Sequence, residues 1–189
     1  MPSNIEIKAR ARDPERLRQL AERLSDTPPE VLEQHDTFFP SPRGRLKLRQ
    51  FSPHSGELIF YSRPDVAGAR QSDYVIAQTA SPADLRAVLS AALGVNGTVT
   101  KTRRLLRVGQ TRIHLDEVAG LGAFVELEVV LREGQTPEQG RRVARHLMAA
   151  LEIDESELVA GAYADLLAAA DAVQVSKAAQ EDPSLADGG

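Results

Sequence analysis

The segment NIEIKAR, residues 4–10, alternates polar and apolar side chains, and the segment FVELEV, residues 124–129, repeats that alternation. In a β-strand, alternate side chains share one face. Glu6 and Lys8 therefore share a face of the first strand, and the two glutamates of the second segment share a face of the other. Several strands that each place charges of both signs on one face favour a polar cavity over an ordinary solvent-facing sheet.

The composition is typical of one globular domain. A chain of 189 residues that is 42% hydrophobic and 26% charged can bury a substantial core. The sequence has no Cys, which excludes disulfides, thiolate metal ligands and cysteine nucleophiles.

Charge and hydropathy indicate where in the cell the protein is expected and which partners it is expected to lack. The net charge of −4 gives no overall attraction to nucleic acid or to anionic membranes. The start of the chain lacks the apolar region of a secretory signal, and no run approaches the roughly 18 apolar residues that span a bilayer. We therefore expect a cytoplasmic protein with no membrane or nucleic-acid partner.

Turn and capping signals divide the chain into strands and helices. Helix starts are predicted at Asp13-Pro14, and at capping boxes beginning at Ser81 and Thr136. A last helix is expected over 162–173. Residues 1–175 form one predicted domain, and 176–189 a disordered tail. The expected strands cover residues 4–10, 31–39, 45–51, 57–63, 72–79, 98–108, 111–118 and 123–132.

The fold class that explains this pattern best is α+β, with a closed antiparallel β-barrel and helices packed outside. The amphipathic helices need an apolar surface, and the outer strand faces supply one: Ile5, Ile7, Leu46, Leu48, Ile113, Leu115, Val125 and Leu127. The barrel is then polar inside, the reverse of a packed small barrel. The residues expected in the lumen are Glu6, Lys8, Arg45, Lys47, Arg49, Arg112, His114, Asp116, Glu126 and Glu128.

Rows of cations on this lumen predict phosphate binding. Arg45, Lys47 and Arg49 alternate on one strand, and Lys101 and Arg103 on another. Their spacing suits a chain of phosphates, each of which accepts charge-assisted hydrogen bonds. Carboxylates on the same lumen would hold Mg²⁺ or Mn²⁺, which prefer oxygen ligands. Cations for phosphate together with carboxylates for metal are typical of phosphoryl transfer.

Each motif has a simpler interpretation when it is taken alone. Residues 43–49 could be a solvated or nucleic-acid-binding stretch, and Glu126 and Glu128 could face solvent. His114 alone is a hydrogen-bonded structural histidine, and residues 120–122 are a turn. The combination is what favours a site.

That combination resembles the CYTH superfamily, which includes class IV adenylyl cyclases and thiamine triphosphatases. The resemblance covers residues 3–170, and the segments RIHLD and GLGAF are closest to the cyclase-like branch. It implies an eight-stranded closed antiparallel barrel, the triphosphate tunnel. The matching segments, in order, are EIK at 6–8, RLKLR at 45–49, KTR at 101–103, RIHLD at 112–116 and GLGAFVELE at 120–128.

The resemblance also implies roles for individual residues. The metal ligands would be Glu6, Asp116, Glu126 and Glu128. Lys8, Lys101 and Arg103 would grip the triphosphate and serve catalysis. The substrate ligands would be Lys47, Arg49, Arg63 and Arg112, together with Arg45 from the same cation row; Arg70 is a substitute for Arg63.

One position departs from the family pattern, because Asn4 replaces the first Glu of the opening Glu-x-Glu-x-Lys motif. An amide can ligate through its oxygen but adds no charge.

The predicted activity is cyclase-like, from ATP to cyclic AMP and pyrophosphate. The alternatives are a triphosphatase acting on tripolyphosphate or thiamine triphosphate, and a non-catalytic polyphosphate- or nucleotide-binding module. A homodimer is compatible with the sequence.

Overall fold

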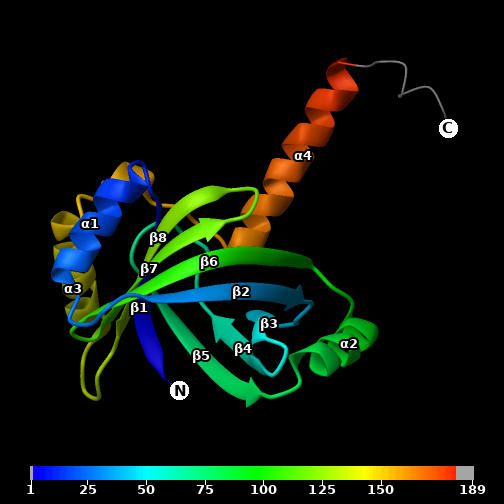
Figure 1. The fold of residues 1–189 in the computed structure, drawn as a ribbon, viewed down its shortest axis with the longest axis horizontal. Helices are drawn as coiled ribbons and strands as arrows, with labels where there is room; N and C mark the ends of the chain where they lie inside the picture. The colour runs from blue at the N-terminus through cyan, green and yellow to red at the C-terminus, as the bar shows by residue number, and fades with distance from the viewer. Residues whose placement is uncertain (1, 182–189) are drawn as a thin grey trace.

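The computed structural model describes residues 2–181, which fold as a closed barrel with helices outside (Figure 1). The order around the barrel is β1-β5-β4-β3-β2-β6-β7-β8, and every neighbouring pair is antiparallel. The predicted fold is thus confirmed. The strands are β1 (Ser3–Arg10), β2 (Glu30–Phe39), β3 (Arg45–Ser52), β4 (Ser55–Ser62), β5 (Arg70–Thr79), β6 (Gly97–Val108), β7 (Thr111–Val118) and β8 (Gly122–Val130). The helices are α1 (Pro14–Leu24), α2 (Pro82–Leu93), α3 (Pro137–Ala150) and α4 (Tyr163–Glu181), with a 3₁₀ turn at Glu155–Glu157.

Two of the three predicted helix caps form as expected. The Asp13 carboxylate accepts from the backbone N–H of Arg16, and Thr136 forms a reciprocal capping box with Gln139. The capping box predicted at Ser81 is wrong, because that side chain makes no capping hydrogen bond. The third helical residue here is Asp84, whose side chain is one methylene shorter than the Glu or Gln of a capping box.

Helices α1 and α3 cover one side of the barrel, where they lie side by side (Figure 1). Leu17 of α1 and Leu147 of α3 pack on outward-facing strand residues that are at most 1% exposed, including Ile7, Ile113 and Leu127. Burying such a side chain contributes about 1.5–3 kcal/mol. Gly140 lets α3 approach β1 closely, since a Cβ there would lie 2.6 Å from the side chain of Ile5.

Apolar side chains close one end of the lumen. Phe124 and three neighbours share the lumen face of their strands at this end, and the start of α4 packs on them. The rings of Phe124 and Tyr163 meet edge to face, 5.1 Å between centroids. The tunnel is therefore blind, with a floor made of Phe38, Val99, Val118, Phe124, Ala162 and Tyr163.

Beyond the floor, α4 extends away from the barrel (Figure 1). The helix runs to Glu181 rather than ending near 173, so the predicted tail boundary at 176 lies inside it. The rest of that predicted tail, 182–189, lies outside the described residues. Among residues 2–181, no helix is both long enough and apolar enough to cross a membrane.

Candidate active site

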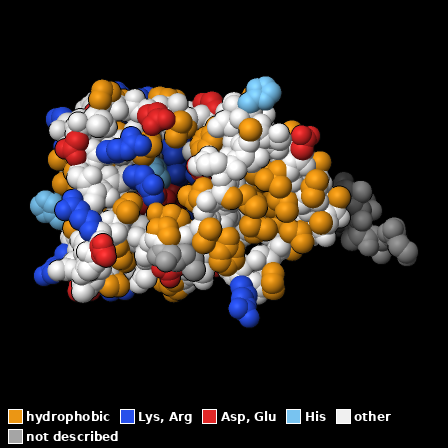
Figure 2. All heavy atoms as spheres, turned by 90° about the horizontal axis from the view of Figure 1, so that it is seen from below, with side chains coloured by type: hydrophobic (Ala, Val, Ile, Leu, Met, Phe, Trp, Pro, Cys, Tyr) orange, Lys and Arg blue, Asp and Glu red, His pale blue; other side chains and the backbone are white. Residues whose placement is uncertain are grey.

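The lumen is a charged cavity of about 260 Å³. Figure 2 shows its mouth as a hollow, with Lys and Arg side chains at the rim and acidic side chains inside. More cations than carboxylates line it, although the whole chain is negative. The tunnel therefore attracts anions locally. The charged lining residues are Lys8, Lys47, Arg49, Arg63, Lys101, Arg103, Arg112, Glu6, Asp36, Glu57, Glu126 and Glu128.

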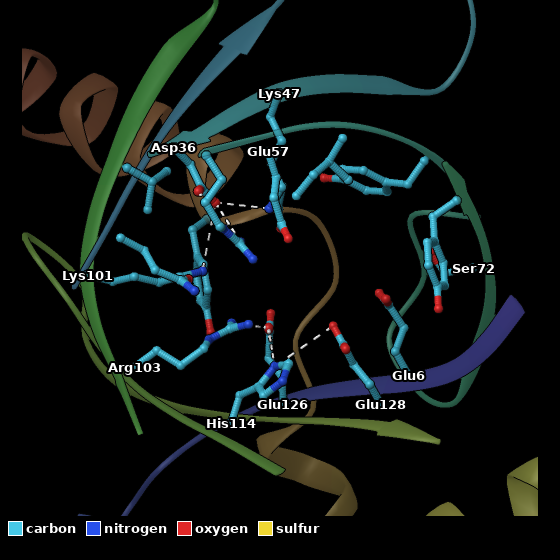
Figure 3. Close-up of a pocket in the computed structure, with 18 of the residues that line it drawn as sticks. Glu6, Asp36, Lys47, Glu57, Ser72, Lys101, Arg103, His114, Glu126 and Glu128 are labelled. Carbon is cyan, nitrogen blue, oxygen red and sulfur yellow. Dashed lines mark hydrogen bonds and ion pairs between the residues drawn. The ribbon is translucent and has the colours of Figure 1, made fainter. Parts of the chain in front are cut away.

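One side of the lumen is a cation wall, formed by Asp36, Lys47, Arg49 and Lys101 (Figure 3). Strand pairing brings these residues together, because β2 lies between β3 and β6 and each side chain faces inward. Asp36 accepts from Lys47 Nζ at 2.9 Å and from Arg49 Nε at 2.8 Å, and Lys101 Nζ lies 3.9 Å from it. One carboxylate thus faces three cations, which leaves positive charge for a bound anion.

Burial and neighbouring charges have opposite effects on the pKa of Asp36, whose side chain is 1% exposed. Burial would raise its pKa, but Arg49, Lys47 and Lys101 outweigh burial and hold that pKa well below its usual range. Asp36 is therefore ionised at neutral pH and holds the cation wall together.

Two buried lysines approach the centre of the tunnel. Burial, and then the charge of Arg103, lower the pKa of Lys101 to about 7. Burial also lowers the pKa of Lys8, whose Nζ lies 2.9 Å from the Gly161 carbonyl oxygen and 3.9 Å from the ring centroid of Tyr163. A lysine with a pKa near 7 can accept or donate a proton at neutral pH.

The opposite side is a carboxylate wall, formed by Glu6, His114, Glu126 and Glu128 (Figure 3). β1, β7 and β8 are neighbours, and their register places His114 beside Glu126 and Glu6 beside Glu128. His114, Glu126 and Glu128 each offer a ligand atom, and the three atoms lie within 4.8 Å of one another.

Glu126 is ionised despite its burial. Burial alone would raise its pKa, but Lys8, His114 and Arg103 together hold it well below the usual range. Buried, ionised oxygen ligands that converge on one point suit a hard divalent cation. The chemistry of this donor set therefore fits the Mg²⁺ or Mn²⁺ that the sequence predicts.

Arg103 links the lumen to the floor. Its guanidinium donates to both Asp116 oxygens, at 2.6 and 2.5 Å, and to Glu126 at 2.7 Å. The Tyr163 hydroxyl donates to Asp116 at 3.0 Å. Asp116 does not line the cavity, and its observed contacts orient Arg103. Its predicted role as a metal ligand stays a prediction.

Arg63 and Arg70 both contact Glu6, and they differ in access to the lumen. Arg63 lines the cavity and contacts the Glu6 carboxylate. Arg70 Nε lies 3.1 Å from Glu6 Oε1, but its Nη1 donates to the Val66 carbonyl, and Arg70 is not part of the lining. Glu6 therefore carries two arginine contacts, and metal binding by it remains a prediction.

Arg45 and Arg112 were both predicted to face the lumen, and the structure places only one of them there. Arg112 lines the lumen and lies 3.0 Å from Glu128. The expectation that Arg45 faces the lumen is wrong. As the first residue of β3 it lies at the floor end, where it pairs with Asp65 at 2.7 Å and with Asp165 of α4 at 2.8 Å.

Sequence reasoning missed some of the lumen. Asp36 was not singled out, because both faces of β2 mix polar and apolar residues. Tyr163 was missed because a helix start far along the chain places it in the tunnel. The simpler interpretation of His114, a hydrogen-bonded structural histidine, is not supported at Nδ1, which has no hydrogen-bond partner among the described residues.

A barrel in which a cation wall faces a carboxylate wall defines a class of protein whose tunnel is suited to anions. The sequence comparison identifies the family: the chain belongs to the CYTH domain family, whose profile matches residues 3–163. No curated protein matches the chain.

Solved structures agree with this fold. The PH1012 protein of Pyrococcus horikoshii is 21% identical, with a TM-score of 0.77 over 87% of this chain and 99% of that one. A candidate adenylate cyclase of Vibrio parahaemolyticus is 18% identical, with a TM-score of 0.70 over 87% and 97%. A candidate adenylyl cyclase of Hippeastrum, described as having a dominant triphosphatase activity, is 18% identical, with a TM-score of 0.57 over 84% and 90%.

Proposed function

We propose that this protein is a divalent-metal-dependent enzyme that acts on a triphosphate held in the tunnel. The observation that carries the proposal is the opposition of the two walls across one cavity. Cations in excess on one wall suit phosphate oxygens, and ionised carboxylates on the other suit a metal.

The phosphate chain enters with its terminal phosphate towards the blind floor. Lys47 and Arg49 bind its oxygens from the cation wall, and Arg103 and Lys8 bind them from nearer the floor. In the free protein these cations contact Asp36, Asp116 and Glu126, so the walls are held in shape before substrate arrives. Such preorganisation reduces the cost of aligning charges in the transition state.

Cyclisation of ATP is the reaction that the sequence resemblance favours. The ribose 3′-hydroxyl attacks the α-phosphorus, the bond to pyrophosphate breaks, and Lys101 accepts the hydroxyl proton. The pKa of Lys101 is about 7 in the free protein, and bound phosphate raises it, so Lys101 accepts the proton in the fraction of complexes in which it is neutral. A divalent cation held by Glu126 and Glu128 would neutralise charge on the phosphate oxygens and the leaving group.

Hydrolysis is the second candidate, and the size of the cavity favours it. Ligand pockets usually measure about 300–1,000 Å³. A lumen of about 260 Å³ suits a phosphate chain, with any nucleoside at the mouth. In this reaction water attacks the terminal phosphorus and loses its proton to Lys101, the bond from that phosphorus to the bridging oxygen breaks, and orthophosphate and the remaining diphosphate are released.

Product identification tests the proposal. The purified protein is incubated with ATP, tripolyphosphate and thiamine triphosphate, each with Mg²⁺ or Mn²⁺, and the products are separated by ion-exchange chromatography. Cyclic AMP with pyrophosphate supports cyclisation, and orthophosphate supports hydrolysis.

The same experiment can overturn the enzyme proposal. If tripolyphosphate raises the melting temperature equally with and without metal, and no substrate turns over, the protein is a binding module. Asn4, which lines the tunnel in place of an acidic residue, is the feature consistent with that outcome.

A further inference from the structure

His114 presents a buried ring nitrogen to the carboxylate wall. The residue is 4% exposed, and its Nδ1 makes no hydrogen bond to any residue that the structure describes. Buried polar atoms are nearly always satisfied, so this nitrogen calls for a partner such as an ion or a water. Figure 3 shows the imidazole directed towards Glu126 and Glu128.

The distances around this nitrogen fit one metal ion. Nδ1 lies 3.7 Å from Glu126 Oε2 and 3.8 Å from Glu128 Oε1, both too long for hydrogen bonds. A metal bound at about 2.0–2.2 Å separates neighbouring ligand atoms by about 3–4.4 Å. The three atoms therefore have the spacing of ligands around a single ion.

Each carboxylate keeps capacity for a metal bond. Glu126 Oε2 accepts from Arg103 at 2.7 Å, and a carboxylate oxygen has a second lone pair. Glu128 pairs with Arg112 through Oε2, whereas its Oε1 is the atom that faces His114. The strand register fixes this arrangement, since His114 is opposite Glu126 across β7 and β8, and Glu128 is two residues along the same face.

We propose that His114 Nδ1 ligates the metal together with Glu126 and Glu128, and that this nitrogen makes the site select Mn²⁺ over Mg²⁺. The inference rests on the proposed function, which requires a metal in the tunnel. Mg²⁺ strongly prefers oxygen ligands and retains its waters, whereas imidazole is a good ligand for first-row transition metals. An all-carboxylate site would lack this discrimination.

Pulsed electron paramagnetic resonance of the full chain loaded with Mn²⁺ tests the nitrogen bond directly. We expect a ¹⁴N hyperfine coupling in the unaltered protein and its loss in His114→Gln. The matched control is His35→Gln, because His35 is exposed on the outer face of β2 and should leave the coupling unchanged.

Calorimetric titrations with Mn²⁺ and Mg²⁺ test the selectivity. We expect His114→Gln to weaken Mn²⁺ binding about tenfold or more, since losing even an outer-shell partner of a metal ligand costs about 10–100-fold in affinity. Binding of Mg²⁺ should change by less than about threefold, since oxygen ligands dominate it.

The outcomes separate the two proposals. Mn²⁺ bound to the unaltered protein without nitrogen coupling, or equal weakening of both metals, overturns the role of His114 and leaves the triphosphate proposal standing. Absence of metal binding with and without tripolyphosphate overturns both. The spectrum of the unaltered protein decides the ligand even if His114→Gln fails to fold.

Discussion

The two walls of the tunnel both bury charged side chains, and they pair those charges in opposite ways. On the cation wall, one buried carboxylate, Asp36, serves three cations. On the carboxylate wall, Glu126 receives Arg103 at 2.7 Å and Lys8 at 3.5 Å, while Glu128 receives Arg112. On the cation wall the carboxylate is outnumbered, whereas on the carboxylate wall every glutamate contacts at least one cation, so the buried charges are paired in the free protein.

The difference indicates what each wall lacks. The cation wall has more positive charge than Asp36 can neutralise, which a phosphate chain would complete. On the carboxylate wall, His114 Nδ1 has no hydrogen-bond partner within residues 2–181, and it lies beside the ionised carboxylates of Glu126 and Glu128, so a metal could bind all three. Changes on the two walls should therefore have separable effects on stability, metal binding and phosphate binding.

Replacing Asp36 with Asn should have the largest effect. The amide keeps the shape but leaves three buried cations without their counter-charge, so we expect the free energy of unfolding to fall by about 3–5 kcal/mol. Urea denaturation measures it. Tripolyphosphate should raise the melting temperature of this variant more than that of the unaltered protein, because it supplies the missing negative charge.

Glu33→Gln is the control for Asp36. Glu33 is on the same strand but exposed, where it accepts from the Thr102 hydroxyl. Its loss should change stability by no more than about 0.5 kcal/mol. Equal losses for the two variants would mean that Asp36 has no special role in the cation wall.

Replacing Glu126 with Gln should mainly affect catalysis. We expect turnover to fall about 100-fold or more, since metal stabilisation of the transition state is worth several kcal/mol. High Mn²⁺ should restore part of the activity. Tripolyphosphate binding without metal should persist or tighten, because a negative charge has left the tunnel. Full activity at low metal concentration would contradict the metal assignment.

Replacing Arg49 with Ala should weaken binding of tripolyphosphate itself. The lost charge-assisted hydrogen bond corresponds to about 1.5–3 kcal/mol, and isothermal titration calorimetry without metal measures it. Arg104→Ala is the control, because Arg104 is on the outer face of β6. If both variants bind equally well, the cation wall is not the phosphate site.

A gradual pH dependence is the smallest predicted effect. Lys101, with a pKa of about 7, is charged below pH 7 and loses its proton above it. Bound triphosphate favours the charged form, so the complex holds more protons above pH 7, and affinity should fall by at most about tenfold per pH unit. Lys101→Met should remove this part of the slope, and the ligand's own ionisation is common to both proteins.

The same shift has the opposite sign for the stability of the free protein. Between about pH 7 and the ordinary lysine pKa of about 10.4, the unfolded chain binds the Lys101 proton more tightly than the folded one. The Lys101 contribution to stability should therefore increase with pH over this window. Denaturation at pH 7 and pH 9, compared between the unaltered protein and Lys101→Met, would reveal it.

Strand alternation made much of this site predictable. Glu6, Lys47 and Glu126 lie on strands whose two faces differ clearly, so their odd or even position along the strand (its parity) is enough to assign them to the lumen. Parity fails in β2, where Asp36 shares its face with Leu32 and Phe38. It also fails at strand ends, where Arg45 has the expected parity but reaches past the barrel to other partners.

The floor was the least predictable part. Tyr163 reaches the lumen because α4 docks across the end of the barrel, and no local pattern in the sequence encodes that docking. The orphan nitrogen of His114 has the same origin, because its lack of a partner depends on distances set by three strands at once.

Because the floor closes one end of the tunnel, substrate and product would share a single opening. Each product must leave through the mouth by which the next substrate enters, so we expect pyrophosphate to be a competitive inhibitor. Under the proposed hydrolysis, a polyphosphate longer than the tunnel would insert only its end, which would restrict cleavage to terminal units and exclude cuts in the middle of the chain. The packing of Tyr163 against Phe124 thus determines the direction in which a long substrate would be shortened.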